Sequence, residues 1–266
     1  MKDFTFHRPK TIVDAVALLK ANAGAKLLAG GQSLLPVLKL DLAEPTDVIS
    51  LGGVTELRDI RVDGDRVVIG ALVTHDVVAR SPDVNKHIPA LAELAGRIGD
   101  PQVRNRGTLG GSVAHADPAA DYPAALLGLG ATIATDRRRI AADDFFTGLW
   151  ETALQPGELI TAVAFPAAQR AAYVKYKQQA SRFALIGVCV AQSAGGVRVG
   201  VTGAKGHAFR ATEIENALAK SFTPEAAKAV KMPTTDINAD LHGSAEYRAA
   251  MISVIASRAV AAALAR

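Results

Sequence analysis

The sequence predicts an α+β fold. Up to about residue 166, short apolar segments of strand length alternate with segments of helical periodicity. Three strand-like segments then follow one another between Tyr173 and Thr202 without a helix between them, as expected for an antiparallel sheet. Helical segments complete the chain, and the last of them, 244–265, carries a broad apolar face suited to packing on that sheet.

The composition indicates an ordinary globular protein. Its 266 residues, 49% hydrophobic and 21% charged, allow one large domain or two smaller ones with a substantial core. The net charge is +4, but the only basic cluster is Arg137–Arg139, a run more typical of a solvated turn than of a nucleic-acid footprint. Aromatic residues make up only 5% of the chain, so nucleic-acid binding is not expected.

A single cysteine limits the redox and metal chemistry of the chain. Cys189 alone excludes an internal disulfide, a cysteine-ligated iron–sulfur cluster and a structural zinc site, and its apolar neighbours indicate a buried, inert thiol. We expect no membrane span, because no run of about 20 apolar residues is present. The first residues contain no apolar signal core, so we expect a cytoplasmic location.

The N-terminal elements resemble half of a dinucleotide-binding unit. Thr11 is placed to cap a first helix, and Gly24 to end it. A strand at 26–29, helical turns at 34–40 and a strand at 48–51 are predicted to follow. No Gly-x-Gly-x-x-Gly is present, so a Rossmann fold lacks its fingerprint.

The middle of the chain predicts a hairpin, two helices and two long loops. Asp63-Gly64-Asp65 is flanked by strand-like segments at 57–62 and 66–70. Helices are predicted to begin at Thr74 and to span 88–98, and strands to span 131–135 and 159–165. We expect a polar, kinked loop at 99–107 and a long loop at 112–123, whose length favours a functional role.

A second domain is predicted to begin near Gln169-Arg170. Its expected strands are 173–177, 185–192 and 197–202, and its expected helices are 211–218, 225–230 and 244–265. This gives a first domain over 1–170, with subdomains of about 1–55 and 56–170, and a second over 171–266.

Two glycine motifs carry the functional prediction. Ala29-Gly30-Gly31-Gln32-Ser33 and Thr108-Leu109-Gly110-Gly111-Ser112 each place adjacent glycines and a hydroxyl group beside an apolar run. Adjacent glycines allow positive φ angles and a close approach of the backbone to a ligand, and successive N–H groups suit a phosphate. Two such loops in one domain predict a single ligand with two phosphates, held from both sides.

The two motifs, in this order, resemble the FAD-diphosphate motifs of the molybdenum hydroxylase flavoproteins, the medium subunits of the carbon monoxide dehydrogenase and xanthine dehydrogenase family. The likeness extends to Arg104-Asn105-Arg106-Gly107, to the segment 117–123, and to a C-terminal part that includes 175–177 and 182–184. It covers the whole chain. It implies a FAD-binding domain of the vanillyl-alcohol-oxidase type, also called PCMH-like, with two α/β subdomains, followed by a small C-terminal domain with a three-stranded antiparallel sheet and helices.

The resemblance implies a set of residues that bind FAD noncovalently. Leu27, Leu28, Ala29, Gly30, Gly31, Gln32, Ser33 and Leu34 would hold one side of the diphosphate, and Thr108, Leu109, Gly110, Gly111 and Ser112 the other. Asp121 would hydrogen-bond the polyol or ribose, Ile98 and Ile160 would lie against the ring systems, and Lys175 would lie near the flavin.

Some of these assignments have structural alternatives. Asp121 would equally cap the helix that follows it, Ile98 and Ile160 would be core residues in almost any fold, and the register could place Lys177 instead of Lys175 at the flavin. Valine at Gly31 or Gly110 is expected to fill the space of the diphosphate while leaving much of the fold intact.

The family resemblance also implies an electron-transfer role within a complex. A large subunit would carry the molybdenum–molybdopterin cofactor, and a small subunit with [2Fe–2S] clusters would pass electrons to the FAD of this chain, which would discharge them to an external acceptor. A dimer of heterotrimers is the expected assembly. The alternatives are a self-contained FAD-dependent oxidase or reductase of the same fold, or a non-catalytic nucleotide-binding module.

Overall fold

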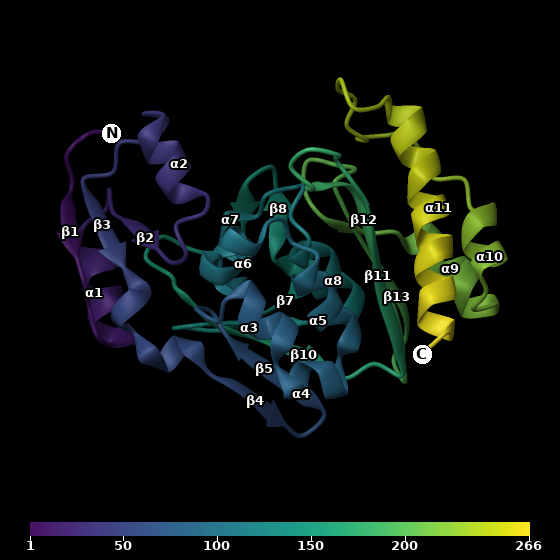
Figure 1. The fold of residues 1–266 in the computed structure, drawn as a ribbon, viewed down its shortest axis with the longest axis horizontal. Coiled ribbons are helices and arrows are strands. Elements are labelled where there is room, and N and C mark those ends of the chain that lie inside the picture. Colours follow the sequence, from purple (N-terminus) through teal and green to yellow (C-terminus); the bar gives the residue numbers. More distant parts are fainter.

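The structure is a computed structural model that describes residues 1–266. Three groups of elements follow one another along the molecule, and the two termini lie at opposite ends (Figure 1). Each group is built on its own main sheet, of three, five and four strands in chain order. The α+β fold class is therefore confirmed.

The N-terminal group is a parallel sheet with two helices. Its strands are β1 (Thr5–His7), β3 (Asp47–Ser50) and β2 (Lys26–Leu28), in that spatial order. Helix α1 (Ile12–Ala21) begins as predicted, because the Thr11 hydroxyl accepts a hydrogen bond from the Asp14 N–H. Helix α2 (Leu34–Lys39) follows the first glycine motif.

The middle group is an antiparallel sheet covered by short helices. The sheet has the order β4 (Ile60–Asp63), β5 (Arg66–Gly70), β10 (Ile160–Pro166), β6 (Thr132–Thr135) and β7 (Arg139–Ala141). Between β5 and β6 the chain forms α3 (His75–Arg80), α4 (Pro82–His87), α5 (Pro89–Gly96), α6 (Pro101–Arg106), α7 (Leu109–His115) and α8 (Tyr122–Leu129). A small hairpin, β8 (Phe146–Gly148) and β9 (Glu151–Thr152), precedes β10.

The C-terminal group is an antiparallel sheet with helices on both faces. Its strands are β11 (Arg170–Lys177), β12 (Ala184–Ser193), β13 (Gly196–Thr202) and β14 (Phe209–Arg210), so a short fourth strand adds to the three predicted. Helices α9 (Thr212–Lys220), α10 (Pro224–Ala229) and α11 (Ala245–Leu264) complete the chain. Helices α5 and α8 contact one face of this sheet, and α9 and α11 contact the other.

The residues of β12 alternate between two hydrophobic cores. Cys189 and Ala191 belong to the core of the middle group, whereas Ile186, Val188 and Val190 belong to the core under α11. This is the two-residue period of a strand with both faces buried. Cys189 is 1% exposed, and burial raises the pKa of its thiol to about 12, which confirms the prediction of an inert cysteine.

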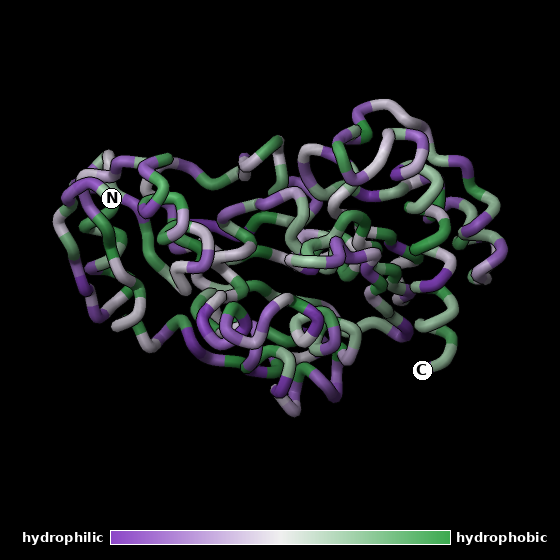
Figure 2. The backbone as a smooth tube through the Cα atoms, turned by 45° about the horizontal axis from the view of Figure 1, so that its top comes forward, coloured by the Kyte–Doolittle hydropathy of each residue, from purple (hydrophilic) through white to green (hydrophobic).

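The hydrophobic packing is continuous across the predicted domain boundary. Ala171 and Tyr173 of β11 lie in the same core as Leu126 of α8 and Phe165 of β10. Hydrophobic stretches run through the middle of the molecule, where these layers meet (Figure 2). The division near residue 170 therefore marks a change of sheet within one packed body.

Helix α11 has the length and hydropathy of a membrane span, contrary to the expectation that no such segment is present. It packs along β11 and β12, and Ile252, Ile255 and Val260 on its inner side are fully buried. The apolar face of α11 therefore packs on the C-terminal sheet, as the sequence predicted.

The structure corrects several predicted elements. The segments 99–107 and 112–123, predicted as loops, contain helix α6, most of α7 and the start of α8. Asp100 caps α6 by accepting from the Val103 N–H, with Pro101 at the first helical position, which is a start signal that the sequence carries. Strands β1, β7, β8, β9 and β14, each of only two or three residues, were not predicted.

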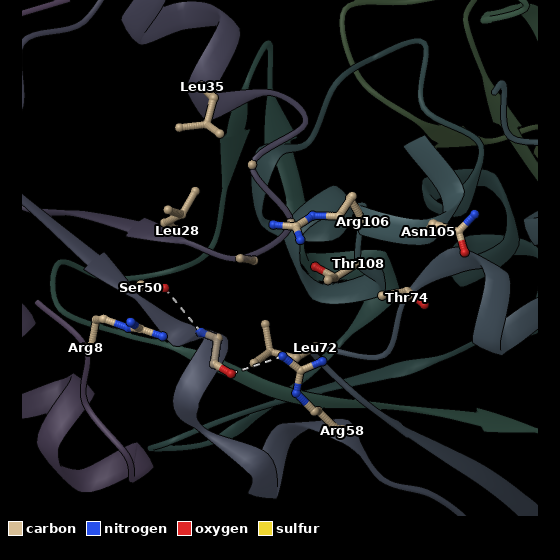
Figure 3. A pocket seen from close by; sticks show the side chains of 14 residues that line it. Arg8, Leu28, Leu35, Ser50, Arg58, Leu72, Thr74, Asn105, Arg106 and Thr108 are labelled. Carbon is tan, nitrogen blue, oxygen red and sulfur yellow. Dashed lines mark hydrogen bonds between the residues drawn. The ribbon is translucent and has the colours of Figure 1, made fainter. Parts of the chain in front are cut away.

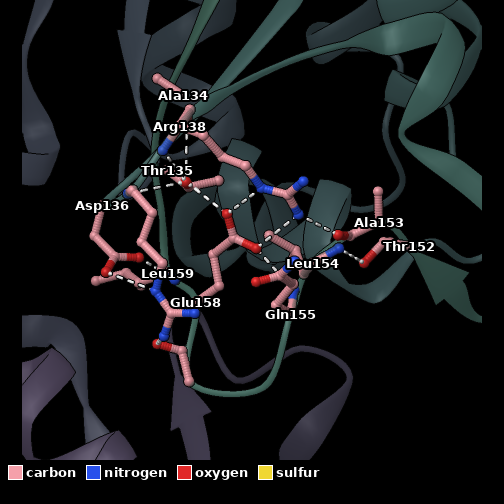
Figure 4. A network of polar contacts seen from close by, with 12 residues as sticks. Ala134, Thr135, Asp136, Arg138, Thr152, Ala153, Leu154, Gln155, Glu158 and Leu159 are labelled. Carbon is pink, nitrogen blue, oxygen red and sulfur yellow. Dashed lines mark hydrogen bonds and ion pairs between the residues drawn. The ribbon is translucent and has the colours of Figure 1, made fainter.

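A buried carboxylate holds the turn after β6 against the loop before β10 (Figure 4). Glu158 accepts hydrogen bonds from Arg138 Nε at 2.9 Å, from the Thr135 hydroxyl at 2.8 Å and from the Gln155 N–H at 2.7 Å. These donors, Arg138 above all, lower the pKa of Glu158 to about 2. The Arg137–Arg139 run is therefore not a fully solvated turn, since Arg138 is part of this network.

We expect Glu158→Gln to destabilise the fold by about 2–3 kcal/mol, because an amide places N–H groups where donors already point. The free energy of unfolding from urea titration measures the effect. As a control, Glu44→Gln removes an exposed carboxylate that pairs with Lys2 at 3.6 Å, and should change stability by less than about 0.5 kcal/mol. Equal effects of the two variants would contradict a structural role for Glu158.

Candidate functional site

The site forms where the parallel sheet ends. Because β1, β2 and β3 run in the same direction, their carboxyl ends lie at one edge of the sheet. Arg8, Ala29 and Ser50 lie at this edge, at or directly after the ends of the strands. Such an edge is where open sheets with parallel strands bind ligands. The first glycine motif begins at this point, directly after β2.

The first glycine loop presents unpaired backbone donors. The N–H groups of Gly30, Gly31, Gln32 and Ser33 make no hydrogen bond to any protein acceptor. Gly31 has a φ of +75°, a conformation that favours glycine, and it turns the chain between β2 and α2. Four successive free donors are the arrangement that suits an anion.

The second glycine loop is different, because its N–H groups are already bonded. Leu109 N donates to Val73 O at 3.0 Å, Gly110 N to Ala71 O at 2.9 Å, and Gly111 N to the Thr108 hydroxyl at 3.1 Å. These bonds attach the loop to the chain after β5 and cap α7. The expectation of equivalent chemistry in the two loops is therefore wrong for the backbone donors.

Gly110 is required by packing and not by the space for a ligand. A Cβ placed there would lie 2.5 Å from the Ala71 Cβ and 2.8 Å from the Ala71 carbonyl oxygen. Valine at Gly110 would therefore disturb the fold, which corrects the expectation that it would fill a diphosphate site and spare the fold.

The first loop touches the segment that leads into the second loop. A Cβ on Gly30 would lie 2.1 Å from the Arg106 carbonyl oxygen and 2.8 Å from the Gly107 Cα. Only a glycine at position 30 lets the first loop lie this close to the chain that leads into the second. Elements of the first and second sheets thereby form one site.

A cavity of about 350 Å³ lies between these segments (Figure 3). Five of the predicted site residues line it: Leu28, Ala29, Gly30, Gly31 and Thr108. Residues that were not predicted complete the lining: Arg8, Leu35, Ser50, Gly52, Arg58, Leu72, Thr74, Asn105 and Arg106. Three arginines and no carboxylate line the cavity, so its chemistry favours an anion.

A second part of the predicted site is a buried polar cluster on α8 and β11. Lys175 Nζ lies 3.0 Å from Asp121 Oδ2 and 3.1 Å from the Arg97 carbonyl oxygen, and the Tyr173 hydroxyl donates to Asp121 Oδ1. The side chains of Lys175 and Asp121 are 4% and 7% exposed. Burial raises the pKa of the Asp121 carboxyl, and the charge of Lys175 opposes that shift.

Within this cluster Asp121 does not cap a helix, and the two candidate lysines differ in burial. Asp121 makes no side-chain cap to α8, since its carboxylate is occupied by Tyr173 and Lys175. Of the two candidate lysines, Lys175 forms the buried pair, whereas Lys177 is exposed at the end of β11.

The remaining predicted residues lie away from the cavity wall. Ile160 is 4% exposed in the core of the middle group, and Ile98 is half-buried against the same core. Leu27, Gln32, Ser33 and Leu34 flank the first loop, and Leu109 and Ser112 belong to α7. Contact of these residues with a cofactor stays a prediction.

A buried histidine, His75, contacts the chain just before the second glycine loop. His75 is 5% exposed, and its ring lies 5.3 Å from the ring of Tyr122. The backbone N–H of His75 donates to the Gly107 carbonyl at 3.0 Å. Its Nδ1 has no hydrogen-bond partner. Burial, with a contribution from the charge of Arg104, lowers the pKa of His75 to about 4, so the ring is neutral at pH 7.

The donor set fits a phosphorylated cofactor. Free N–H groups, guanidinium groups and hydroxyls surround the cavity, which suits the diphosphate of FAD. No group of three His, Cys, Asp or Glu side chains is arranged to hold a metal ion.

Comparison with known proteins also indicates a FAD-binding protein. Residues 2–168 match the family described as the FAD-binding domain in molybdopterin dehydrogenase. The chain is 39% identical to the carbon monoxide dehydrogenase medium chain of Hydrogenophaga pseudoflava, covering 99% of this chain and 98% of the relative. It is also 39% identical to the nicotine 6-hydroxylase medium subunit of Paenarthrobacter nicotinovorans, over 97% and 96% of the two chains.

Solved structures share the fold over nearly the whole chain. A chain of carbon monoxide dehydrogenase from Hydrogenophaga pseudoflava superposes with a TM-score of 0.90 at 39% identity, covering 99% of this chain and 98% of that one. A chain of quinoline 2-oxidoreductase from Pseudomonas putida 86 gives a TM-score of 0.89 at 30% identity, over 99% and 98%.

We predict that His75 makes the fold less stable in mild acid. Its pKa is near 6.5 when unfolded and about 4 when folded, so below about pH 6.5 the unfolded state binds a proton that the folded state excludes. Between pH 7 and pH 4.5 this costs about 2–3 kcal/mol, which His75→Asn should abolish. Urea unfolding of both proteins at the two pH values measures it, and identical pH dependence would show that His75 is not buried as a neutral ring.

Proposed function

The chain belongs to the family of FAD-binding medium subunits of molybdenum hydroxylases, and from this premise we propose that it accepts electrons from [2Fe–2S] clusters of a partner subunit and passes them to an external acceptor. Bound FAD would supply the redox chemistry of this step. The observation that carries the proposal is the donor-lined cavity beside the two glycine loops, with Gly30 and Gly31, whose N–H groups are free, on one wall.

The residues of the chain divide into those that would hold the diphosphate and those that would serve the flavin. Leu27–Leu34 and Thr108–Ser112 would surround the diphosphate, the first loop through its N–H groups and the second chiefly through the Thr108 hydroxyl. Asp121, Ile98 and Ile160 would contact the polyol and the rings. Lys175, held by Asp121, would place a positive charge near the flavin, where it would stabilise the reduced anionic form.

The proposed assembly follows from what this chain lacks and from the names of its relatives. One cysteine cannot ligate iron–sulfur clusters, so these belong to a small partner subunit, and the molybdenum–molybdopterin cofactor belongs to a large one. Relatives are named for carbon monoxide, nicotine and glyceraldehyde, so we propose that the large subunit selects the substrate. A dimer of heterotrimers in the cytoplasm completes the proposal.

Gly30→Ala should weaken FAD binding by at least about tenfold. The new Cβ cannot lie 2.1 Å from the Arg106 carbonyl, so the two loops must separate and the cavity loses its shape. Titration of the apoprotein with FAD, followed by flavin fluorescence, measures the affinity. Gly64→Ala is the control, because Gly64 lies in the β4–β5 turn and a Cβ there meets nothing within 4 Å, although Gly64, unlike Gly30, has a positive φ of +59°; it should leave FAD affinity unchanged.

The electron-transfer role is tested by coexpression with the genes that neighbour this one. We expect the chain to purify with FAD, together with an iron–sulfur subunit and a molybdopterin subunit, and we expect the iron–sulfur absorbance to bleach before the flavin when substrate is added. FAD on a chain that reduces acceptors alone would favour the self-contained oxidase or reductase. A complex whose flavin stays oxidised throughout turnover would contradict the proposed role.

A further inference from the structure

Three arginines converge on the cavity from three separate segments. Arg8 follows β1, Arg58 ends the 3₁₀ turn Thr55–Arg58, and Arg106 ends α6. Figure 3 shows their guanidinium groups directed toward the space between the two loops. None of the three forms an ion pair with a carboxylate, although the chain contains 26 Asp and Glu residues.

The rest of the cavity wall adds hydrogen-bond donors and no negative charge. Thr108, Thr74 and Ser50 line it, and each hydroxyl oxygen already accepts a backbone N–H, from Gly111, Val77 and Gly52 respectively. A hydroxyl that has accepted such a bond retains its own O–H to donate. The hydroxyls and the guanidinium groups therefore present donors to the same enclosed space.

We propose that Arg8, Arg58 and Arg106 form a clamp for the diphosphate of a dinucleotide, in addition to the glycine loops. The inference rests on the proposed function, since it assigns these residues to the FAD of that site. Guanidinium groups bind phosphate oxygens in a planar, bidentate manner. The cavity of about 350 Å³ is at the lower end of small-molecule sites, which fits the diphosphate region of FAD rather than the whole cofactor.

The placement of the clamp explains why both sheets contribute to it. Arg8 belongs to the parallel sheet, Arg106 to the chain before the second glycine loop, and Arg58 to the link between them, where its Nη2 donates to the Gly52 carbonyl at 3.2 Å. Without an anion, the three like charges repel one another across the cavity. A bound diphosphate replaces this repulsion by attraction and draws the first and second sheets together.

The test compares the binding of FAD and ADP by the full-length apoprotein and its variants. FAD is followed by flavin fluorescence, and ADP by competition with FAD. We expect Arg8→Gln, Arg58→Gln and Arg106→Gln each to weaken both ligands by about tenfold, and the triple variant by about a hundredfold or more. Raising the salt concentration should weaken binding to wild type more than binding to the triple variant.

Two controls separate recognition from folding. Arg61→Gln removes an arginine whose side chain is 58% exposed and paired with Asp59, and it should not change either affinity. Arg106→Lys, which keeps the charge but not the planar fork, should recover part of the affinity lost in Arg106→Gln. The melting temperature of the apoprotein should be unchanged or higher in the glutamine variants, because they relieve repulsion.

The outcomes distinguish this inference from the proposed function. If wild type binds FAD and ADP but the glutamine variants bind them equally well, the clamp is wrong and the FAD site stands. If the variants lose affinity only in proportion to a lowered melting temperature, the arginines support the fold and the clamp is again wrong. If wild type binds neither ligand, the FAD function itself fails.

Discussion

The structure of the site depends on the close approach of Gly30 to the Arg106 carbonyl. A single added carbon would lie 2.1 Å from that oxygen, so the contact exists only because position 30 has no side chain. It fixes the first loop, with its free N–H groups, against the segment that supplies Arg106 and Thr108. The parallel and antiparallel sheets have separate hydrogen-bond ladders, and this contact joins them around a ligand-sized space.

The features that local sequence chemistry controls could be predicted. Thr11 and Thr74 cap the helices that they were expected to start, and Asp63-Gly64-Asp65 forms the expected hairpin turn. The apolar run of β12 predicted a strand, and the glycine motif at 30–31 predicted a loop, which has a positive φ at Gly31. In each case neighbours within a few residues determine the structure, so a local pattern is sufficient.

The part of the site that depends on distant contacts could not be predicted. Arg8 becomes a site residue only because the three-residue strand β1 pairs with β3, 42 residues later in the chain, and so short a strand has no periodicity to detect. The N–H groups of the second loop looked free in the sequence, but they bond to Ala71 and Val73. Lys175 and Asp121 were identified separately, and only the packing of α8 against the sheet makes them a pair.

Stability alone does not explain the buried ion pair of Lys175 and Asp121. Among the ion pairs of the chain, Lys175 and Asp121 are the two partners that are both less than a tenth exposed. Removing two charges from water costs about as much free energy as their attraction returns, and apolar side chains would join α8 to β11 at least as well. The pair makes two further hydrogen bonds: Lys175 Nζ donates to the Arg97 carbonyl, and the Tyr173 hydroxyl donates to Asp121. A cation held at a fixed place is of use to a redox cofactor whose charge changes, so the pair has a physical reason in a FAD protein that it would lack in a structural module.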